Sequence, residues 1–231
     1  MSDGMTREDF LRERRRLGPE RMDRLFAPHY DRHWGEVGES HRQGVAWLLQ
    51  RTPEAALVLD AGCGTGKYWP QIIAAGRHPF GIDRSSGMLA QAARKHPDVE
   101  ARLLPMEDLW RDRAFQDRFD GAICMDAMEN VPPEDWSAVL RGLVGAVHVG
   151  GPILLTVEVP QEEDRSALAN PPPPLVQGEI LFPNGGYHHY PGLDCVTEWV
   201  EAAGLEVLSV AEGDGYTHLR GRRREPATTT R

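Results

Sequence analysis

The sequence has few cysteines, and their spacing argues against several kinds of protein. It contains three, Cys63, Cys124 and Cys195, spread over 231 residues and without a Cys-x-x-Cys pair. An odd number of widely spaced cysteines predicts neither a zinc site nor a disulfide framework. We therefore expect no metal, although the chain has nine histidines. We also expect a cytoplasmic protein, where thiols stay reduced.

Long apolar runs and an excess of positive charge are also missing. No run approaches the roughly 20 residues that cross a bilayer, and the first nine residues lack the apolar stretch of a signal peptide. Lysine and arginine number 26 against 35 aspartates and glutamates, a net charge of −9. Because nucleic-acid binding needs a basic face, we expect a soluble protein with a small-molecule acceptor, no nucleic-acid or membrane partner, and a monomeric or homodimeric state.

Strands and helices alternate from about residue 56 onward. Short apolar runs predict strands at residues 57–60, 79–83, 99–104, 119–125 and 153–157, with amphipathic helices between them. Two further runs, at 205–210 and 216–219, predict a closing antiparallel hairpin. This alternation is typical of an α/β fold, a doubly wound and mostly parallel seven-stranded sheet that binds its ligand at the carboxyl ends of its strands.

Three regions are expected along the chain. Residues 1–52 predict an N-terminal helical lid, broken near Gly18 and Pro19 and followed by a helix that Ser40 caps. Residues 53–220 are expected to form the main α/β domain, in which the proline-rich stretch 160–191 is a long cover loop. The polar residues 221–231 predict a disordered tail.

A glycine-rich loop follows the first predicted strand, at residues 60–66. Glycines there let the backbone approach a ligand closely. The spacing does not match the dinucleotide fingerprint, and Asp60 would repel a pyrophosphate but attract an ammonium group. A phosphate-binding P-loop would need glycine at position 61 and serine or threonine at 68, where the chain has Ala61 and Tyr68.

Residues 60–66, Asp83 after the second strand and residues 104–109 after the third together resemble the motifs of class I S-adenosylmethionine-dependent methyltransferases. The resemblance covers about residues 56–160. It implies S-adenosylmethionine as cofactor, with the glycine loop at its methionine end, Asp83 on both ribose hydroxyls and Met106 on the adenine. Pro105 stands where the family often has aspartate, so Glu107 is the candidate for the adenine amino group. The expected cofactor residues are Asp60, Gly62, Cys63, Gly64, Gly66, Asp83, Arg84, Met88, Met106, Glu107, Met125 and Tyr30.

Aromatic side chains of the predicted lid are candidates for the cofactor's sulfonium. Tyr30 and Trp34 could cover this positive charge by cation–π attraction. Packing among the lid helices accounts for them equally well. Both interpretations stay open at this point.

Two segments supply candidate catalytic groups. Asp126 and Glu129 follow the fourth strand, where the resemblance places the substrate, although a turn cap and a solvated carboxylate explain them equally well. His188 and His189 lie in the cover loop, and in an extended segment only one of them faces the pocket. We favour His188 as general base. Glu158, at the end of the fifth strand, either faces the pocket or solvent.

The leading hypothesis for function is transfer of a methyl group to O, N or C of a small acceptor, such as a secondary metabolite. Two alternatives stay open on the sequence. One is an enzyme of the same fold that binds S-adenosylmethionine but catalyses a reaction other than methylation. The other is a catalytically silent partner subunit that retains the cofactor pocket.

Overall fold

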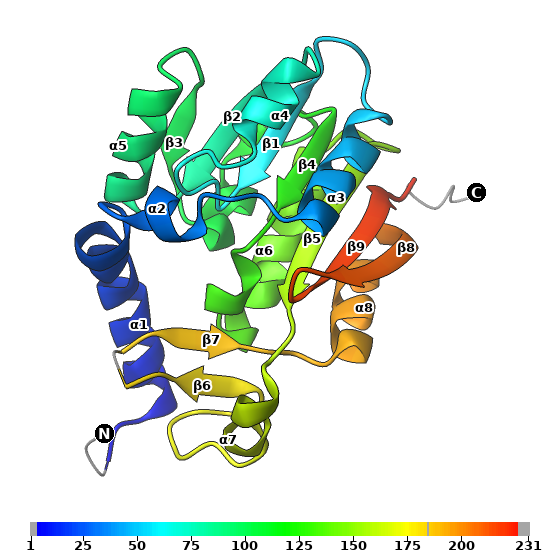
Figure 1. The fold of residues 1–231 in the computed structure, drawn as a ribbon. Helices are drawn as coiled ribbons and strands as arrows, with labels where there is room; N and C mark the ends of the chain where they lie inside the picture. Colours follow the sequence, from blue (N-terminus) through cyan, green and yellow to red (C-terminus); the bar gives the residue numbers. More distant parts are fainter. Residues whose placement is uncertain (1–3, 184, 226–231) are drawn as a thin grey trace.

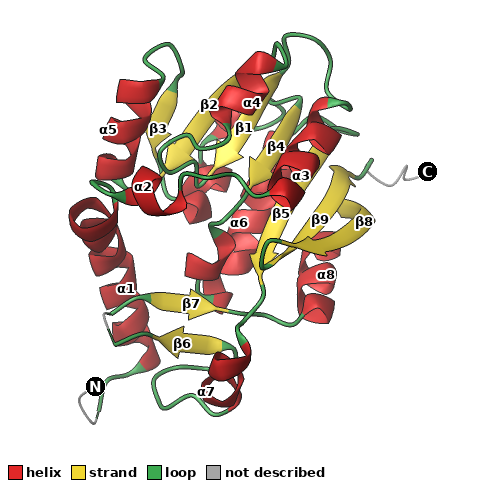
Figure 2. Cartoon of the chain, viewed as in Figure 1, coloured by secondary structure: helices red, strands yellow, loops and turns green. Residues whose placement is uncertain are grey.

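A seven-stranded sheet forms the centre of the computed structural model, which describes residues 4–183 and 185–225 (Figures 1 and 2). Its strand order is β3-β2-β1-β4-β5-β9-β8. The first five strands in this order run parallel to one another. β9 pairs antiparallel with both β5 and β8. This arrangement confirms the predicted fold class and closing hairpin. The strands are β1 (Leu57–Ala61), β2 (His78–Asp83), β3 (Ala101–Leu103), β4 (Gly121–Cys124), β5 (Pro152–Glu158), β8 (Leu205–Gly213) and β9 (Tyr216–Arg223).

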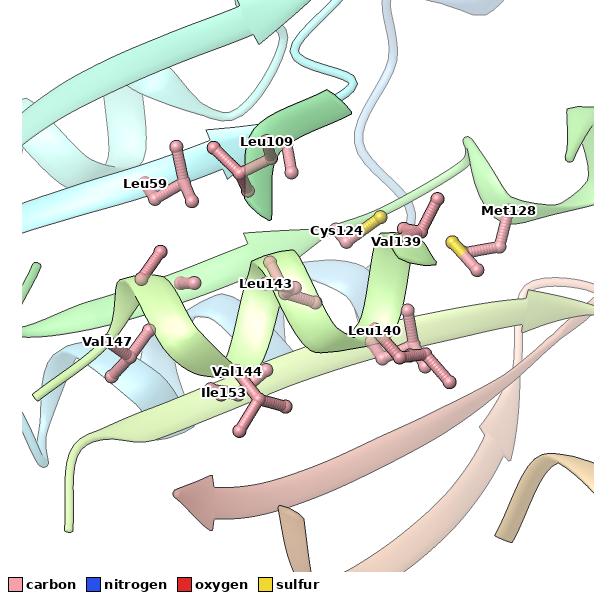
Figure 3. Packing of buried hydrophobic residues seen from close by; sticks show 14 of the residues in the cluster. Leu59, Leu109, Cys124, Met128, Val139, Leu140, Leu143, Val144, Val147 and Ile153 are labelled. Atoms are coloured by element: carbon pink, nitrogen blue, oxygen red, sulfur yellow. The ribbon is translucent and has the colours of Figure 1, made fainter. Parts of the chain in front are cut away.

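Helices cover both faces of the sheet. The helices are α1 (Arg7–Arg21), α2 (Tyr30–Trp34), α3 (Glu39–Leu49), α4 (Trp69–Ala74), α5 (Ser86–Lys95), α6 (Pro133–Ala146), α7 (Arg165–Ala169) and α8 (Leu193–Ala202), with the π-helical turn η1 (Met22–Phe26) and the 3₁₀ turns η2 (Met106–Arg111), η3 (Arg113–Phe115), η4 (Met128–Asn130) and η5 (Glu162–Asp164). One apolar core joins α3, α4 and α5 to one face, and a larger core joins α6, α8 and η2 to the other. Figure 3 shows α6 burying Val139, Leu140 and Leu143 in the larger core.

The order of the strands fixes where a ligand binds. β1 pairs with β2 on one side and with β4 on the other. The connection after β1 therefore leads toward β2, whereas the connection after β4 leads toward β5, on the opposite side of the sheet. In such sheets the crevice at this point, beyond the carboxyl ends of the strands, holds the ligand. The loops after β1 and β4 therefore border the expected site.

The N-terminal region differs from the prediction in two places. α1 is not broken at Gly18 and Pro19 but runs through them to Arg21. Proline lacks the N–H that would bond the carbonyl four residues back, and that carbonyl, of Arg15, accepts a hydrogen bond from Nη2 of Arg84 instead (3.2 Å). Such a partner for the freed carbonyl compensates the helix for the missing bond.

The predicted cap of the next helix is also wrong. α3 begins after Gly38, and the N–H of Ser40 donates to Oδ2 of Asp214 (2.7 Å). The helix buries Val45 and Leu48 completely against the sheet. It is therefore a layer of the sheet domain, although residues 1–52 were all expected in the lid.

The stretch 160–191 is more ordered than a cover loop. It contains α7 and an antiparallel pair, β6 (Glu179–Leu181) and β7 (Tyr187–His189). β6 and β7 lie beside α1 (Figure 1), where Phe10 and Leu11 pack with Tyr187. Arg7 donates two hydrogen bonds to the carboxylate of Glu179, at 2.6 and 2.7 Å. These contacts join the N-terminal helix to the cover segment.

The end of the chain corrects one further boundary. The tail was expected from residue 221, but Gly221, Arg222 and Arg223 belong to β9 and pair with β5 and β8. Residues 226–231 of the expected tail lie outside the described residues. No helix among residues 4–183 and 185–225 is long and apolar enough to cross a membrane.

Candidate functional site

A cavity of about 860 Å³ opens at the carboxyl ends of the parallel strands. Its walls come from the loops after β1, β2, β4 and β5, from the segment α1 to α2, and from β7 with the turn before it. Pockets for one drug-sized ligand span about 300–1,000 Å³, so this cavity is near the upper end of the range. The space suits a nucleoside-containing cofactor together with a small second ligand.

The glycine loop presents bare backbone to this cavity. Gly62 and Gly64 line it and have φ of +76° and +53°, in the left-handed region that side chains disfavour. A Cβ on Gly62 would lie 2.7 Å from Cβ of Ala127, far inside van der Waals contact. The loop therefore requires glycine at position 62, and its backbone faces the cavity without side chains at positions 62 and 64.

Asp83 forms the adjoining wall at the end of β2. Its Oδ2 accepts from the N–H of Gly64 (2.9 Å) and its Oδ1 from the N–H of Ser85 (2.8 Å). Burial raises the pKa of this carboxyl, and the two backbone hydrogen bonds oppose that shift. Each oxygen retains lone pairs for a further donor, so Asp83 can accept two hydroxyl groups at once.

Most of the expected cofactor residues line the cavity, but four lie behind its wall. Those that line it are Tyr30, Gly62, Gly64, Asp83, Arg84, Met88, Met106 and Glu107, and those behind it are Asp60, Cys63, Gly66 and Met125. Asp60 accepts from Nε1 of Trp69 (2.9 Å), and burial raises its pKa to about 7. The Asp60 side chain thus supports the loop from the core, and its direct contact with an ammonium group stays a prediction.

Cys63 and Gly66 have structural surroundings as well. Cys63 packs against β2, where its Sγ would be 2.7 Å from a Cβ on Gly81. The ring of Trp69 comes as close as 2.6 Å to a Cβ placed on Gly66. Both residues shape the loop and lie away from the cavity.

The N-terminal segment lies over the glycine loop, as expected for a lid (Figure 1). Tyr30 and Trp34 line the cavity with ring centroids 5.6 Å apart. Asp31 accepts from Oγ1 of Thr65 (2.5 Å) and lies 2.8 Å from Nζ of Lys95, which fastens α2 to the glycine loop and to α5. The aromatic pair thus both packs within the lid and faces the cavity.

Asp126 is the centre of a dense polar network beside the cavity. Its carboxylate accepts from Tyr68 Oη (2.7 Å) and Lys67 Nζ (3.0 Å), and it lies 2.7 Å from Nε2 of His41. Its own N–H donates to Oγ1 of Thr156 (3.0 Å). Burial by itself raises the pKa of Asp126, but these hydrogen bonds and the positive charge outweigh it and hold the pKa well below its usual range.

Glu129 has the opposite electrostatic surroundings. Its side chain lines the cavity but is buried, and Oε1 accepts from Nδ2 of Asn130 (2.9 Å). Burial, together with the charge of Glu158, raises its pKa well above the ordinary value. The structure therefore brings Asp126 and Glu129 to one cavity but favours the ionised form of the first and the neutral form of the second.

His188 and His189 point to opposite sides of β7. His188 lines the cavity, with Nδ1 2.8 Å from Oε2 of Glu158 and 2.9 Å from Oη of Tyr190. His189 is buried beside Trp136 and does not line the cavity. Burial lowers the pKa of His189 to about 4, so we drop it as a candidate base.

Several residues of the site carried no signal in the sequence. His41 lies between Asp126 and Asp214, with Nδ1 3.4 Å from Oδ2 of Asp214. These partners are 85 and 173 residues away in the chain. Lys67 and Tyr68 directly follow the glycine loop, but nothing in the motif indicated that they bind Asp126.

The histidines do not form a metal site in the part of the chain that the structure describes. His29 and His33 stand four residues apart, a spacing that metal sites use. However, no group of three or more His, Cys, Asp or Glu side chains among residues 4–183 and 185–225 is arranged to hold a metal ion.

Comparison with known proteins identifies relatives of this chain. Residues 58–151 match a family model described as a methyltransferase domain. The chain is 31% identical over 188 residues to a ubiquinone biosynthesis O-methyltransferase of Xanthomonas axonopodis pv. citri, an alignment that covers 77% of this chain and 73% of that protein. It is 33% identical over 101 residues to a magnesium-protoporphyrin O-methyltransferase of Synechocystis, which covers 43% and 44%.

Solved structures share the fold. A 1,6-didemethyltoxoflavin-N1-methyltransferase of Burkholderia thailandensis superimposes with a TM-score of 0.67 at 16% identity, over 97% of this chain and 93% of that one. The magnesium protoporphyrin IX methyltransferase of Synechocystis, with S-adenosylhomocysteine bound, also gives 0.67, at 19% identity over 91% and 99%. Together with the sequence relatives, this fold establishes that the chain belongs to the class I S-adenosylmethionine-dependent methyltransferases, with S-adenosylmethionine as its methyl donor.

Proposed function

We propose that this enzyme methylates a hydroxyl oxygen of a small acceptor and that His188 is the general base. The observation that carries this proposal is the contact between Nδ1 of His188 and the carboxylate of Glu158, at 2.8 Å. The Tyr190 hydroxyl, 2.9 Å from the same nitrogen, fixes the orientation of the ring, and the charge of the nearby carboxylate stabilises the imidazolium that forms when the other nitrogen takes a proton. Nε2 of His188 has no partner among the described side chains, so it is available to an acceptor.

The neighbouring acidic residues are poorer bases. Three donors already surround the Asp126 carboxylate, and its lowered pKa makes it a weak proton acceptor. Glu129, with its raised pKa, favours the neutral acid and donates a hydrogen bond more readily than it accepts a proton. His41 has carboxylate oxygens at both ring nitrogens. Of these groups, only His188 combines an oriented ring with a free nitrogen.

The cofactor half of the cavity fits S-adenosylmethionine. Bound there, it supplies a methyl group on a positively charged sulfur, which a nucleophile can displace. We assign Asp83 to the two ribose hydroxyls and the backbone of Gly62 and Gly64 to the methionine end. Met88 and Met106 offer apolar contact for the adenine, and Glu107 an acceptor for its amino group. The acidic groups that line the cavity suit the cofactor's positive charge.

The two sequence relatives named above support oxygen as the acceptor atom. Both proteins named above from sequence comparison are O-methyltransferases by name. The cavity, at about 860 Å³, is large enough for the cofactor and a compact second molecule. Phe182 packs edge to face on His188, with centroids 5.1 Å apart, and adds an aromatic surface beside the base. A small aromatic alcohol is the acceptor that suits these surroundings best.

Labelled methyl transfer tests the proposal. The purified enzyme is incubated with S-[methyl-²H₃]adenosylmethionine and either a set of phenols or a small-molecule extract of the source cells. We expect products heavier by one labelled methyl group whose fragmentation places it on oxygen. Labelling on nitrogen or carbon alone, or no labelling, would contradict the proposal.

Asp83→Ala tests the ribose contact. Loss of a buried hydrogen-bond acceptor is expected to weaken binding of S-adenosylhomocysteine by about 1–3 kcal/mol, measured by calorimetry. Asp108→Ala is the matched control, because Asp108 lies in η2 and pairs with Arg111 on the surface. Equal affinity of the Asp83 variant and the wild type would remove this assignment.

A further inference from the structure

One arginine of α1 differs from its neighbours in its electrostatic surroundings. The side chains of Arg7, Arg12, Arg15 and Arg16 each lie within 4.0 Å of a carboxylate. Arg14 has no such partner among residues 4–183 and 185–225, and its Nη1 donates to the carbonyl of Gly185 (3.0 Å). Arg14 is half-buried and lines the cavity. It therefore places a positive charge in the cavity without a fixed negative partner.

A second positive charge lies close to it. Arg21, two helical turns further along α1, also lines the cavity, and its guanidinium packs on the ring of Phe26 at 5.4 Å. Burial lowers the pKa of Arg14, and the like charge of Arg21 lowers it further. Arg14 thus has a like charge beside it and no carboxylate within 4.0 Å among the described residues, so an anion that contacts Arg14 would be stabilised.

We propose that Arg14 and Arg21 bind a carboxylate of the methyl acceptor, so that the acceptor is a hydroxy acid. The inference rests on the proposed function insofar as it assigns this anion to the acceptor. Guanidinium groups match a planar carboxylate with paired hydrogen bonds. A singly charged carboxylate fits better than a doubly charged phosphate, because Asp126 and Glu158 line the same cavity.

The position of Arg14 indicates that the carboxylate it binds belongs to the acceptor and not to the cofactor. Arg14 bonds to Gly185, in the turn that leads into β7 and His188. The same short segment therefore carries the candidate base and holds the candidate anion-binding side chain. One ligand that spans both would present its hydroxyl to His188 while its carboxylate lies on Arg14.

Binding to the product complex tests the site without any methyl transfer. The protein is saturated with S-adenosylhomocysteine, and 4-hydroxybenzoate and its methyl ester are compared by ligand-observed NMR titration. We expect the acid to bind about 10- to 100-fold more tightly than the ester, the range for a hydrogen bond to a charged group. Arg14→Gln is expected to abolish this preference. Arg12→Gln, an exposed position on the same helix that pairs with Glu8 and Asp9, should keep it.

Three results would overturn the anion site: equal binding of acid and ester, binding of neither, or a loss of preference in the Arg12 variant as large as in the Arg14 variant. Weaker binding of S-adenosylhomocysteine to the Arg14 variant would assign the arginine to the cofactor's own carboxylate and also overturn it. A failure of the proposed function looks different, since the acid would then bind while no oxygen is methylated.

Discussion

Replacing His188 by alanine is expected to lower kcat by about 10²- to 10⁴-fold, the usual contribution of a general base. The affinity for S-adenosylhomocysteine should stay the same, because His188 lies on β7, away from the glycine loop and Asp83. Single-turnover rates of methyl transfer and calorimetry on the same protein provide the two measurements. Normal turnover by the His188→Ala enzyme would show that the acceptor loses its proton by another route.

Two further variants sharpen this result. Glu158→Gln removes the negative charge beside Nδ1, so the imidazolium loses support and the rising limb of the pH–rate profile should move to lower pH. A purely structural role for Glu158 would lower activity without moving that limb. His148→Ala, at an exposed position after α6, is the control for histidine loss and should leave both measurements unchanged.

Replacing Asp126 by alanine is expected to destabilise the fold by about 3–5 kcal/mol, the cost of removing one partner of a buried ion pair. Lys67 and His41 are both nearly inaccessible to solvent and would lose the carboxylate between them. Urea denaturation at pH 7 measures the change in the free energy of unfolding. A loss below about 1 kcal/mol, as for an exposed pair, would contradict the structural importance of this network.

Asp117→Ala is the matched control for this experiment. Asp126 and Asp117 have similar left-handed backbones, with φ of 52° and 48°, so alanine introduces similar strain at both. Asp117 is exposed and pairs with Arg223 at the surface. The difference between the two variants therefore reports the buried network alone.

The same network predicts how stability depends on pH. The pKa of Asp126 is lower in the folded protein than in the unfolded chain, so its stabilisation is complete above the unfolded value of about 4. As the pH falls below that value, the unfolded state takes up the proton first and stability decreases. The wild type should lose stability between about pH 4 and pH 2 more steeply than Asp126→Asn.

Most of the residues that we assign to the cofactor could be predicted from the sequence, because they are close together in the chain. Gly62 and Gly64 follow one strand and Asp83 ends the next, and parallel strands bring their carboxyl ends to one edge. Even so, the motif did not distinguish residues that line the cavity from those behind it. Asp60 and Gly62 belong to one motif, but the alternation along the strand turns the Asp60 side chain toward Trp69 and the core.

The candidate catalytic residues could be predicted from the sequence only in part. Alternation along an extended segment predicted that His188 and His189 face opposite ways, and their burial confirms it. The sequence offered no means of pairing His188 with Glu158, which lies far earlier in the chain at the end of β5. The network of His41, Asp126 and Asp214 was likewise invisible, because its members come from three distant segments.

The sequence by itself determined the fold class, the cofactor and the glycine loop that we assign to it, since short-range spacing and strand alternation encode them. The tertiary structure decided which carboxylate is ionised, which histidine has an oriented ring and which arginine lacks a negative partner. Those properties depend on burial and on charges a few ångströms away in space. Only the folded chain brings Arg14, Asp126, Glu158 and His188 to the walls of one cavity.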